Sequence, residues 1–244
     1  MRKTKKLKNK IVFIFELIFI TMLIYSLVQI TIWYINTNQN QKIEKEIQNS
    51  ITIETSINNE TYNIDFNALK QTNTDAVAFL KVNGTNIEYI VVKGNDNEHY
   101  LNHNFEKKYN KAGWIFMDYK NKLDGTDKNI VIYGHNMRDG SMFGTLKDTL
   151  KEEWYNNEEN KYITLITENE QLTYQIFSIY QIEKEDYYIN TNFTIEEFEL
   201  FIKTIKERSI KDFNTDLTTQ DSILTLSTCA NNNKYRVVLH AKKL

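Results

Sequence analysis

The chain contains one cysteine, seven glycines and no proline among its 244 residues. A disulfide-stapled scaffold requires paired cysteines, and a structural zinc or iron–sulfur site requires several, so the single thiol excludes all three. The lack of proline and the few glycines exclude collagen-like and proline-rich linker proteins. The remaining composition, 41% hydrophobic and 25% charged, is typical of a globular protein of one or two domains.

The N-terminus joins a basic segment to a long apolar run. Residues 1–10 carry six positive charges and no acidic residue, and 20 of the 25 residues in 11–35 are apolar. As a helix this run is about 37 Å long, enough to cross a hydrocarbon core of about 30 Å. The alternative, a cleaved signal peptide, has an apolar core of only about 7 to 15 residues that ends in small residues. We therefore predict a cytoplasmic basic head (1–10), an uncleaved transmembrane anchor (11–35) and an extracellular remainder in a single-pass membrane protein.

The predicted extracellular part is acidic. Residues 36–244 hold 24 of the 30 basic residues and 31 of the 32 acidic ones, a net charge of −7. Such a surface repels phosphate groups, so we expect neither nucleic acid nor an anionic lipid surface as a partner.

This part divides into a helical segment and a β-rich domain. Apolar residues within 36–71 predict a juxtamembrane helix (Ile43, Ile47, Ile51) and a short docking helix (Ile64, Phe66, Leu69). From residue 72 onward, short runs rich in β-branched and aromatic residues predict eight strands: 76–82, 87–92, 113–118, 129–135, 161–167, 172–182, 222–230 and 235–242. The dipeptide Asn83-Gly84 predicts a hairpin between the first two strands. The pattern is typical of a mainly β domain, a sandwich or a barrel.

Two helical insertions are predicted between these strands. Residues 142–150 follow the fourth strand, and residues 194–208 lie between the sixth and the seventh. Thr194 and Glu197 have the spacing of a capping box. We expect the longer helix to pack on the β domain through one apolar face, formed by Ile195, Phe198, Phe201, Ile202 and Ile205.

The single thiol, Cys229, ends the seventh predicted strand, just before the polar residues 231–234. A cysteine in a strand is most often a small buried hydrophobe. A free thiol outside the cell, at a strand end, instead favours a nucleophile. With an ordinary pKa of about 8.5, such a thiol is only a few per cent ionised at neutral pH and needs a basic partner.

Of the four histidines, His135 fits that partner best, because it also ends a strand, beside a glycine-containing loop. His240 lies within the last strand, and we expect it to be structural. His99 and His103 have the i, i+4 spacing of two metal ligands on a helix, but no neighbouring acid completes a metalloprotease motif. An ordinary polar surface is the alternative for this pair.

Arg236 begins the last predicted strand, seven residues after Cys229. A hairpin would bring the two residues side by side. There the fixed donors of a guanidinium could stabilise the oxyanion of an acyl transfer. Taken alone, Arg236 could equally be a surface residue on an edge strand.

Together these residues resemble the sortases, the cysteine transpeptidases of Gram-positive cell surfaces. The similarity rests on residues 133–136 (YGHN), 225–229 (TLSTC) and 235–240 (YRVVLH), in matching order within about residue 70 to the C-terminus. Residues 115–119 (IFMDY) and the long helix before the seventh strand resemble class B. The resemblance implies a closed eight-stranded β-barrel, preceded by N-terminal helices, with its active site in a groove at one end. The catalytic domain would then be residues 72–244.

The resemblance also implies the roles of individual residues. Cys229 corresponds to the nucleophile, His135 to the general acid and base, and Arg236 to the residue that positions substrate and stabilises the oxyanion. The corresponding substrate-binding residues are Ser227, Thr228, Tyr188 and Ile189, with Tyr187 as an alternative match to Tyr188.

The implied reaction cleaves a C-terminal sorting motif after threonine in secreted proteins, of the Asn-Pro-x-Thr or Pro-x-Thr-Gly type. A thioacyl-enzyme forms and is passed to an amine of a peptidoglycan peptide or of its lipid-linked precursor. No cofactor and no metal are expected. Two alternatives stay open: a surface cysteine peptidase that releases the acyl group to water, and a membrane-anchored binding module without turnover.

Overall fold

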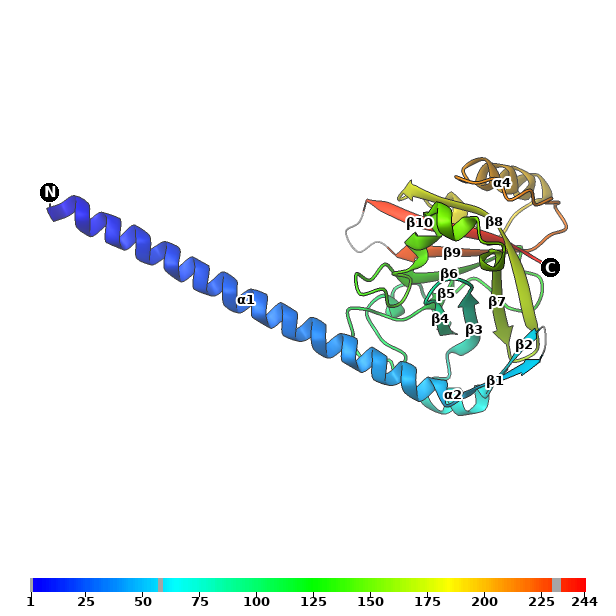
Figure 1. Ribbon diagram of the computed structural model, residues 1–244, viewed down its shortest axis with the longest axis horizontal. Coiled ribbons are helices and arrows are strands. Elements are labelled where there is room, and N and C mark those ends of the chain that lie inside the picture. Colours follow the sequence, from blue (N-terminus) through cyan, green and yellow to red (C-terminus); the bar gives the residue numbers. More distant parts are fainter. Residues whose placement is uncertain (1, 57–58, 230–233) are drawn as a thin grey trace. The chain divides into compact units, whose positions relative to one another are not determined.

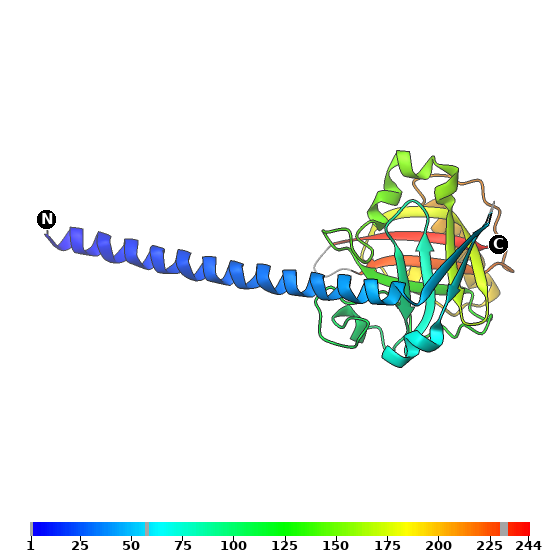
Figure 2. The same cartoon turned by 60° about the horizontal axis from the view of Figure 1, so that its bottom comes forward.

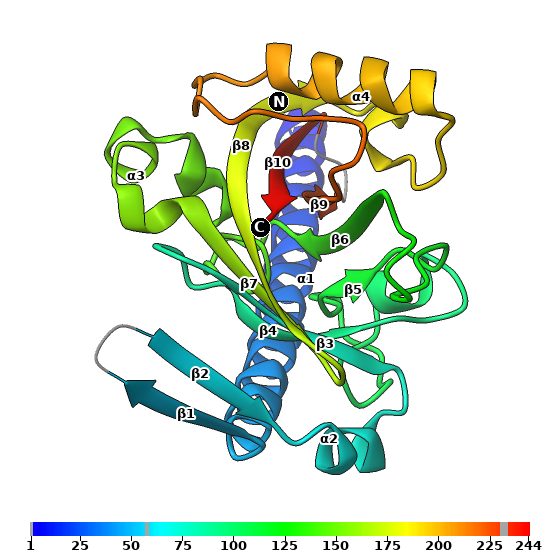
Figure 3. The same cartoon turned by 90° about the vertical axis from the view of Figure 1, so that its right-hand side faces the viewer.

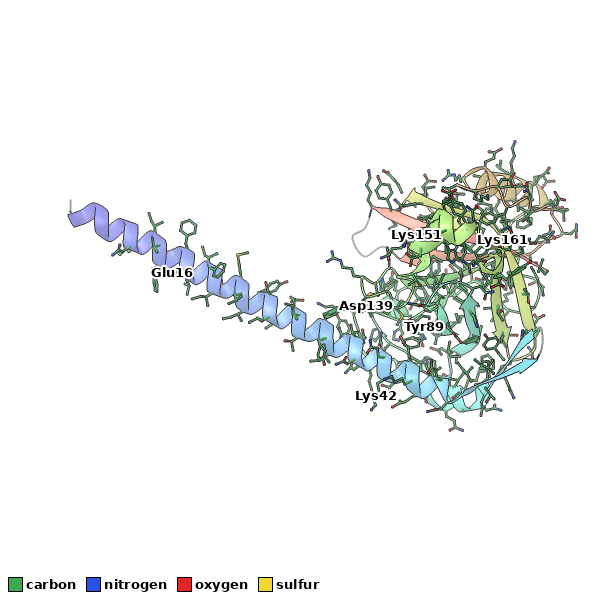
Figure 4. All side chains as sticks on the ribbon, in the orientation of Figure 1. Glu16, Lys42, Tyr89, Asp139, Lys151 and Lys161 are labelled. Atoms are coloured by element: carbon green, nitrogen blue, oxygen red, sulfur yellow. The ribbon has the colours of Figure 1, made fainter. Side chains whose placement is uncertain are left out.

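The computed structural model describes residues 2–56, 59–229 and 234–244, in two units, Met1–Lys42 and Ile43–Leu244. Helix α1 (Arg2–Gln48), blue in Figure 1, begins in the first unit and ends in the second. Its apolar stretch is exposed and is long and apolar enough to cross a membrane. Figure 4 shows Glu16, the acidic residue of that stretch, on the side near the N-terminus. Length and composition therefore make α1 suitable as a membrane anchor.

The second unit begins with the end of α1, where Ile43 and Ile47 are part of the hydrophobic core. The antiparallel strands β1 (Ile51–Ser56) and β2 (Asn59–Ile64) follow, and then helix α2 (Phe66–Thr72), whose first turn is capped by Asp65. The end of α1 and α2 correspond to the two helices predicted between residues 36 and 71. The prediction missed the β1–β2 pair, because Ile51 extends the four-residue repeat of Ile43 and Ile47 and was assigned to the helix.

Eight of the described strands close into a barrel, in the order β10-β8-β7-β3-β4-β5-β6-β9, which Figure 2 shows. Their bounds are β3 (Ala76–Val82), β4 (Glu88–Val92), β5 (Phe116–Met117), β6 (Asn129–His135), β7 (Tyr162–Thr167), β8 (Gln171–Glu183), β9 (Ile223–Cys229) and β10 (Tyr235–Lys243). The mainly β, closed eight-stranded barrel is confirmed. Residue 230, the predicted end of the seventh strand, and residues 231–233 lie outside the described residues.

The strand predictions differ most at β5, which is two residues long where six were expected. Gly113, at the start of the expected strand, has φ +60°, which an extended strand does not allow. In contrast, Gly84 has φ +67° in the predicted turn between β3 and β4, where the left-handed conformation suits a hairpin. Every residue of β6 is buried, which explains why its sequence is a continuous apolar run and not an alternation.

Helix α4 (Ile195–Glu207) lies over β8, as Figure 3 shows. The capping box is confirmed, since Glu197 N–H donates to Thr194 Oγ1 and Thr194 N–H donates to Glu197 Oε2. The predicted apolar face is correct for the four buried residues Phe198, Phe201, Ile202 and Ile205. It is wrong for Ile195, which is 68% exposed because this first helical residue precedes the face that packs.

The other predicted helix, residues 142–150, is only partly helical. Met142 instead forms an isolated β-bridge with Asn136 and has φ +53°, so a right-handed helix cannot include it. The short helices of the domain are η1 (His99–Leu101), η2 (Leu146–Leu150), α3 (Glu152–Tyr155), η3 (Glu158–Lys161) and η4 (Tyr187–Ile189).

His240 lies in the core on β10, fully buried. Its Nδ1 is 2.8 Å from Thr225 Oγ1 and its Nε2 is 2.8 Å from the Tyr180 hydroxyl. Burial lowers the pKa of His240 to about 3. The side chain is therefore a neutral, hydrogen-bonded part of the core, consistent with the structural role expected from its place in the strand.

His240 makes the stability of the barrel depend on pH. In the unfolded chain its pKa is about 6.5, so below that pH the unfolded state binds a proton that the folded state does not. We expect the free energy of unfolding to be constant above about pH 6.5 and to fall by about 1.4 kcal/mol per pH unit between there and pH 3 from this group alone. Urea denaturation at several pH values measures the slope. The slope should be one proton smaller in His240→Asn, and equal slopes would contradict the assignment.

Candidate functional site

The ends of β6 and β9 meet at one rim of the barrel. These strands pair in parallel over seven residues, and the last pair is His135 with Cys229. The main chain thus places the one thiol of the sequence in the position adjacent to a histidine that is 94 residues away along the chain. The adjacency that the two strand ends predicted is present in the backbone register.

Arg236 reaches the same rim on β10. This strand runs antiparallel to β9, with Val238 paired to Ser227. The same register continued by two residues sets Arg236 across from Cys229. Its Nη1 atom is buried and has no hydrogen-bond partner among the described residues. A buried guanidinium donor without an acceptor is costly, and such groups in native proteins call for an explanation such as a bound ligand.

The imidazole of His135 is fixed by one hydrogen bond from its Nε2 to the carbonyl oxygen of Leu101, 2.6 Å away. A carbonyl only accepts, so Nε2 carries the proton in the neutral ring and Nδ1 has a free lone pair. His135 is 6% exposed, and this burial lowers its pKa, although the bond to Leu101 acts in the opposite direction. Near neutral pH the ring is therefore a base that can accept a proton at Nδ1.

Leu101 is held in place by the backbone around it. Its N–H donates to the Glu98 carbonyl in η1, and Trp114 N–H donates to the neighbouring carbonyl of Tyr100. Gly113, immediately before Trp114, has φ +60°, and a Cβ atom there would lie 2.4 Å from Tyr100 O and 2.9 Å from Leu101 O. The close approach that orients His135 is thus possible only with glycine at position 113.

A groove of about 300 Å³ opens at this rim, and we call it the rim groove. It is lined by Asn97, Leu101, Phe116, Tyr133, Lys184, Glu185, Asp186, Tyr188, Ile189, Ser227, Thr228 and Arg236. All four residues expected to bind substrate are in this set, and Arg236 joins them. The structure thus brings together the residues that the resemblance assigned to substrate.

The two alternative tyrosines point to different places. Tyr188 is buried, lines the rim groove, and has its hydroxyl 3.2 Å from Ser227 Oγ. The Tyr187 hydroxyl is instead 2.9 Å from that of Tyr180, and its ring packs against the Arg208 guanidinium. Of the two, Tyr188 is the residue of the groove.

The sequence analysis missed several lining residues. Tyr133 could have been found, because it stands two residues before His135 on the same strand and therefore on the same face. Its hydroxyl donates to Asp118, which also accepts from Asn97 Nδ2, each at 2.8 Å. Asn97 and Leu101 come from a loop whose path no periodicity reveals.

The pair His99 and His103 lies outside the groove lining. Their rings stack with centroids 4.1 Å apart and planes 4° from parallel, and His103 Nδ1 bonds to the His99 carbonyl. Parallel stacked rings direct their nitrogens in the ring planes and not toward a shared point between them. The pair is a packed surface element next to η1.

The sequence and the fold can now be compared with known proteins. The sortase-domain family model matches residues 80–244. Sortase B of Staphylococcus aureus (strain NCTC 8325 / PS 47) is 33% identical over 197 residues, 80% of each chain. A sortase B structure from Clostridium perfringens aligns with a TM-score of 0.69 and 40% identity, over 74% of this chain and 100% of that one.

A third relative covers more of the chain. Sortase B from Bacillus anthracis, solved in complex with AAEK1, aligns with a TM-score of 0.76 and 33% identity, over 86% of this chain and 99% of that one. The identity and coverage extend beyond a shared barrel to the whole catalytic region. The chain therefore belongs to the sortase family, to its class B, and is a cysteine transpeptidase.

Proposed function

We propose that this sortase cleaves a C-terminal sorting motif after threonine in secreted proteins and joins the new carboxyl end to a peptidoglycan amine. Cys229 is the nucleophile, His135 the general acid and base, and Arg236 the oxyanion donor. The peptide lies in the rim groove, against Tyr188, Ile189, Ser227 and Thr228. The catalytic domain comprises residues 72–244.

The first half of the reaction forms a thioester. His135 Nδ1 takes the proton of the Cys229 thiol as sulfur attacks the threonine carbonyl carbon, and the carbonyl oxygen gains negative charge. The Arg236 guanidinium stabilises that oxyanion. The C–N bond then breaks, and imidazolium returns the proton to the departing amine. The acyl group stays on sulfur.

The second half reverses these steps with a new amine. An amine of the wall peptide, or of its lipid-linked precursor, attacks the thioester carbon while His135 removes its proton. The C–S bond breaks, the thiol is restored, and an amide remains. Staphylococcus aureus sortase B has been solved as a substrate complex and in complex with triglycine, which supports a peptide amine as the acceptor here.

One observation carries the proposal: His135, Cys229 and Arg236 come to one rim by strand register, and the adjoining groove holds a buried Arg236 donor with no partner in the described chain. An oxyanion is the kind of acceptor that such a donor lacks before substrate binds. A binding module without turnover would not require this buried cation beside a thiol.

The test mixes the full-length chain in detergent with a sorting-signal peptide and triglycine. An amide product whose yield rises with triglycine supports the transferase, whereas free acid alone at every triglycine concentration supports the peptidase. Matched peptides of the Asn-Pro-x-Thr and Pro-x-Thr-Gly types, compared by kcat/KM, identify the motif.

We also propose that α1 anchors the enzyme with its N-terminus in the cytoplasm and its barrel outside. The six positive charges before residue 11 support this orientation. Because the chain has one thiol, a membrane-impermeant maleimide added to intact cells reports the side directly. Labelling of intact cells agrees with the proposal, and labelling only after lysis contradicts it.

Replacing Gly113 by Ala should damage catalysis without touching the rim groove. The new Cβ collides with Tyr100 O and Leu101 O, so the Leu101 carbonyl moves away from His135 Nε2. We expect kcat/KM to fall by about 10- to 100-fold, within the range that a positioned acid–base contributes. That hydrogen bond raises the pKa of His135, so its loss should shift the acid limb of the pH profile to lower pH.

The matched control for this change is Gly125→Ala. Gly125 also has a positive φ, +83°, but a Cβ there has no neighbour within 4 Å. The control carries the same backbone strain without the collision, so its kcat/KM should stay within about twofold of the parent, as is usual for surface changes. Equal kcat/KM and equal pH profiles in the two variants would contradict the role given to Leu101.

A further inference from the structure

A chain of buried hydrogen bonds runs beneath η4, the turn that forms one wall of the rim groove. It links Asn129 on β6, Thr225 on β9, His240 on β10 and Tyr180 on β8. Asn129, Thr225 and His240 are completely buried and Tyr180 is 2% exposed. The catalytic mechanism uses none of these four side chains.

The direction of each bond follows from the donors and acceptors. Asn129 Nδ2 lies 3.2 Å from the carbonyl of Tyr188 and 2.9 Å from that of Asn190, so both amide protons are donated to η4. The Asn129 Oδ1 atom must then accept from Thr225 Oγ1, 2.7 Å away. Thr225 has only one hydroxyl proton, so it accepts from Nδ1–H of His240.

The same reasoning fixes the other half of the chain. Neutral His240 with a proton on Nδ1 has a lone pair on Nε2, which accepts from the Tyr180 hydroxyl. Tyr180 has then used its proton, so its oxygen accepts from Tyr187 O–H, 2.9 Å away. Every bond has one donor and one acceptor, from Tyr187 through to the carbonyls of Tyr188 and Asn190.

The chain therefore begins and ends on the same turn. It holds the side chain of Tyr187, the first residue of η4, and the two carbonyls at and after its end. A closed circuit of this kind fixes a turn better than separate bonds do, since each member orients the next. Tyr188 and Ile189, between the two attachment points, are the groove residues proposed to contact the peptide.

We propose that Asn129, Thr225, His240 and Tyr180 are positioning residues that hold η4 in the shape that binds the sorting peptide. The inference rests on the proposed function in that η4 is taken as a wall of the peptide site. The four residues act through η4 and touch neither the thiol nor the reacting carbonyl. Their loss should therefore weaken peptide binding more than the chemical step.

The test cuts the circuit with Tyr180→Phe and with Tyr187→Phe in the full-length enzyme. We expect each change to raise KM for the sorting peptide about tenfold, the scale of one lost buried hydrogen bond. The kcat should change by less than about twofold, because binding common to ground state and transition state is what is lost. Since both changes break the same bond, the double variant should be little worse than Tyr180→Phe alone.

The matched control is Tyr174→Phe, which removes a hydroxyl from another buried tyrosine of β8 that lies outside the circuit. It should leave KM unchanged. Alkylation of Cys229 by iodoacetamide should proceed at the parent rate in every variant, which separates positioning of the peptide from damage to the thiol. A fall in kcat and in alkylation rate with KM unchanged would overturn the proposal.

Hydrogen exchange provides a readout that needs no activity. The amides of residues 186–192 should exchange faster in Tyr180→Phe than in Tyr174→Phe, with the barrel strands equally protected in both. Equal exchange in 186–192 would overturn the inference even in an active enzyme. Faster exchange in an enzyme that makes no amide product would support the circuit and contradict the proposed function instead.

Discussion

Cys229→Ala should abolish both amide formation and peptide cleavage. No other residue of the chain carries a thiol, so without it no thioester can form and both halves of the reaction stop. We expect the rate to fall by at least about 10⁴-fold, to the limit of the assay, as when other enzymes lose their nucleophile. Mass spectrometry of the enzyme with sorting peptide alone should show an acyl adduct in the parent and none in the variant.

The variant must keep its fold for this result to be informative. Near-ultraviolet circular dichroism, which reports on the packed aromatic core, should be the same in parent and variant. Binding of the sorting peptide should persist, because the rim groove is left intact. Amide formation at more than a hundredth of the parent rate would exclude Cys229 as the nucleophile.

Arg236→Ala should lower kcat by about 10²- to 10³-fold, the usual effect of losing an oxyanion donor. In contrast to most buried substitutions, it should not destabilise the barrel. Nη1 has no partner among the described residues, so the change removes a buried unsatisfied donor and breaks no bond of that atom. We expect the melting temperature to stay the same or to rise, measured in parallel with kcat.

Two variants sharpen this prediction. Arg236→Lys keeps the charge but loses the planar fork, so its kcat should lie between those of the parent and Arg236→Ala. Arg138→Ala removes an exposed arginine three residues after His135 and should leave kcat within about twofold. If Arg236→Ala lost activity and several degrees of stability together, its role would be structural.

The sequence predicted the elements whose ends carry a local signal. β3 and β6 match their predicted bounds, because Asn83-Gly84 marks one turn and a continuous apolar run marks the buried strand. α4 begins where its capping box sets it. The β1–β2 pair and the irregular start of residues 142–150 have no such signal, since Met142 adopts a left-handed conformation through its bridge to Asn136.

The site was predictable in outline for a similar reason. Two strand ends and a strand start indicated Cys229, His135 and Arg236, and the resemblance supplied their roles. The support of His135 was not predictable, because Leu101 approaches it only after the loop before β5 folds back over Gly113. The circuit beneath η4 could not be predicted either, since it joins four strands through contacts that depend on barrel closure.

The parallel pairing of β6 and β9 has a consequence for how the enzyme matures. In a barrel closed by late strands, His135 has no cysteine beside it until the chain beyond α4 has folded back to β6. Contacts so distant in sequence form late and slowly, because a long loop must first be ordered. A chain still folding as it leaves the membrane thus has an unassisted thiol, and recovery of transpeptidation after refolding is a direct measure of barrel closure.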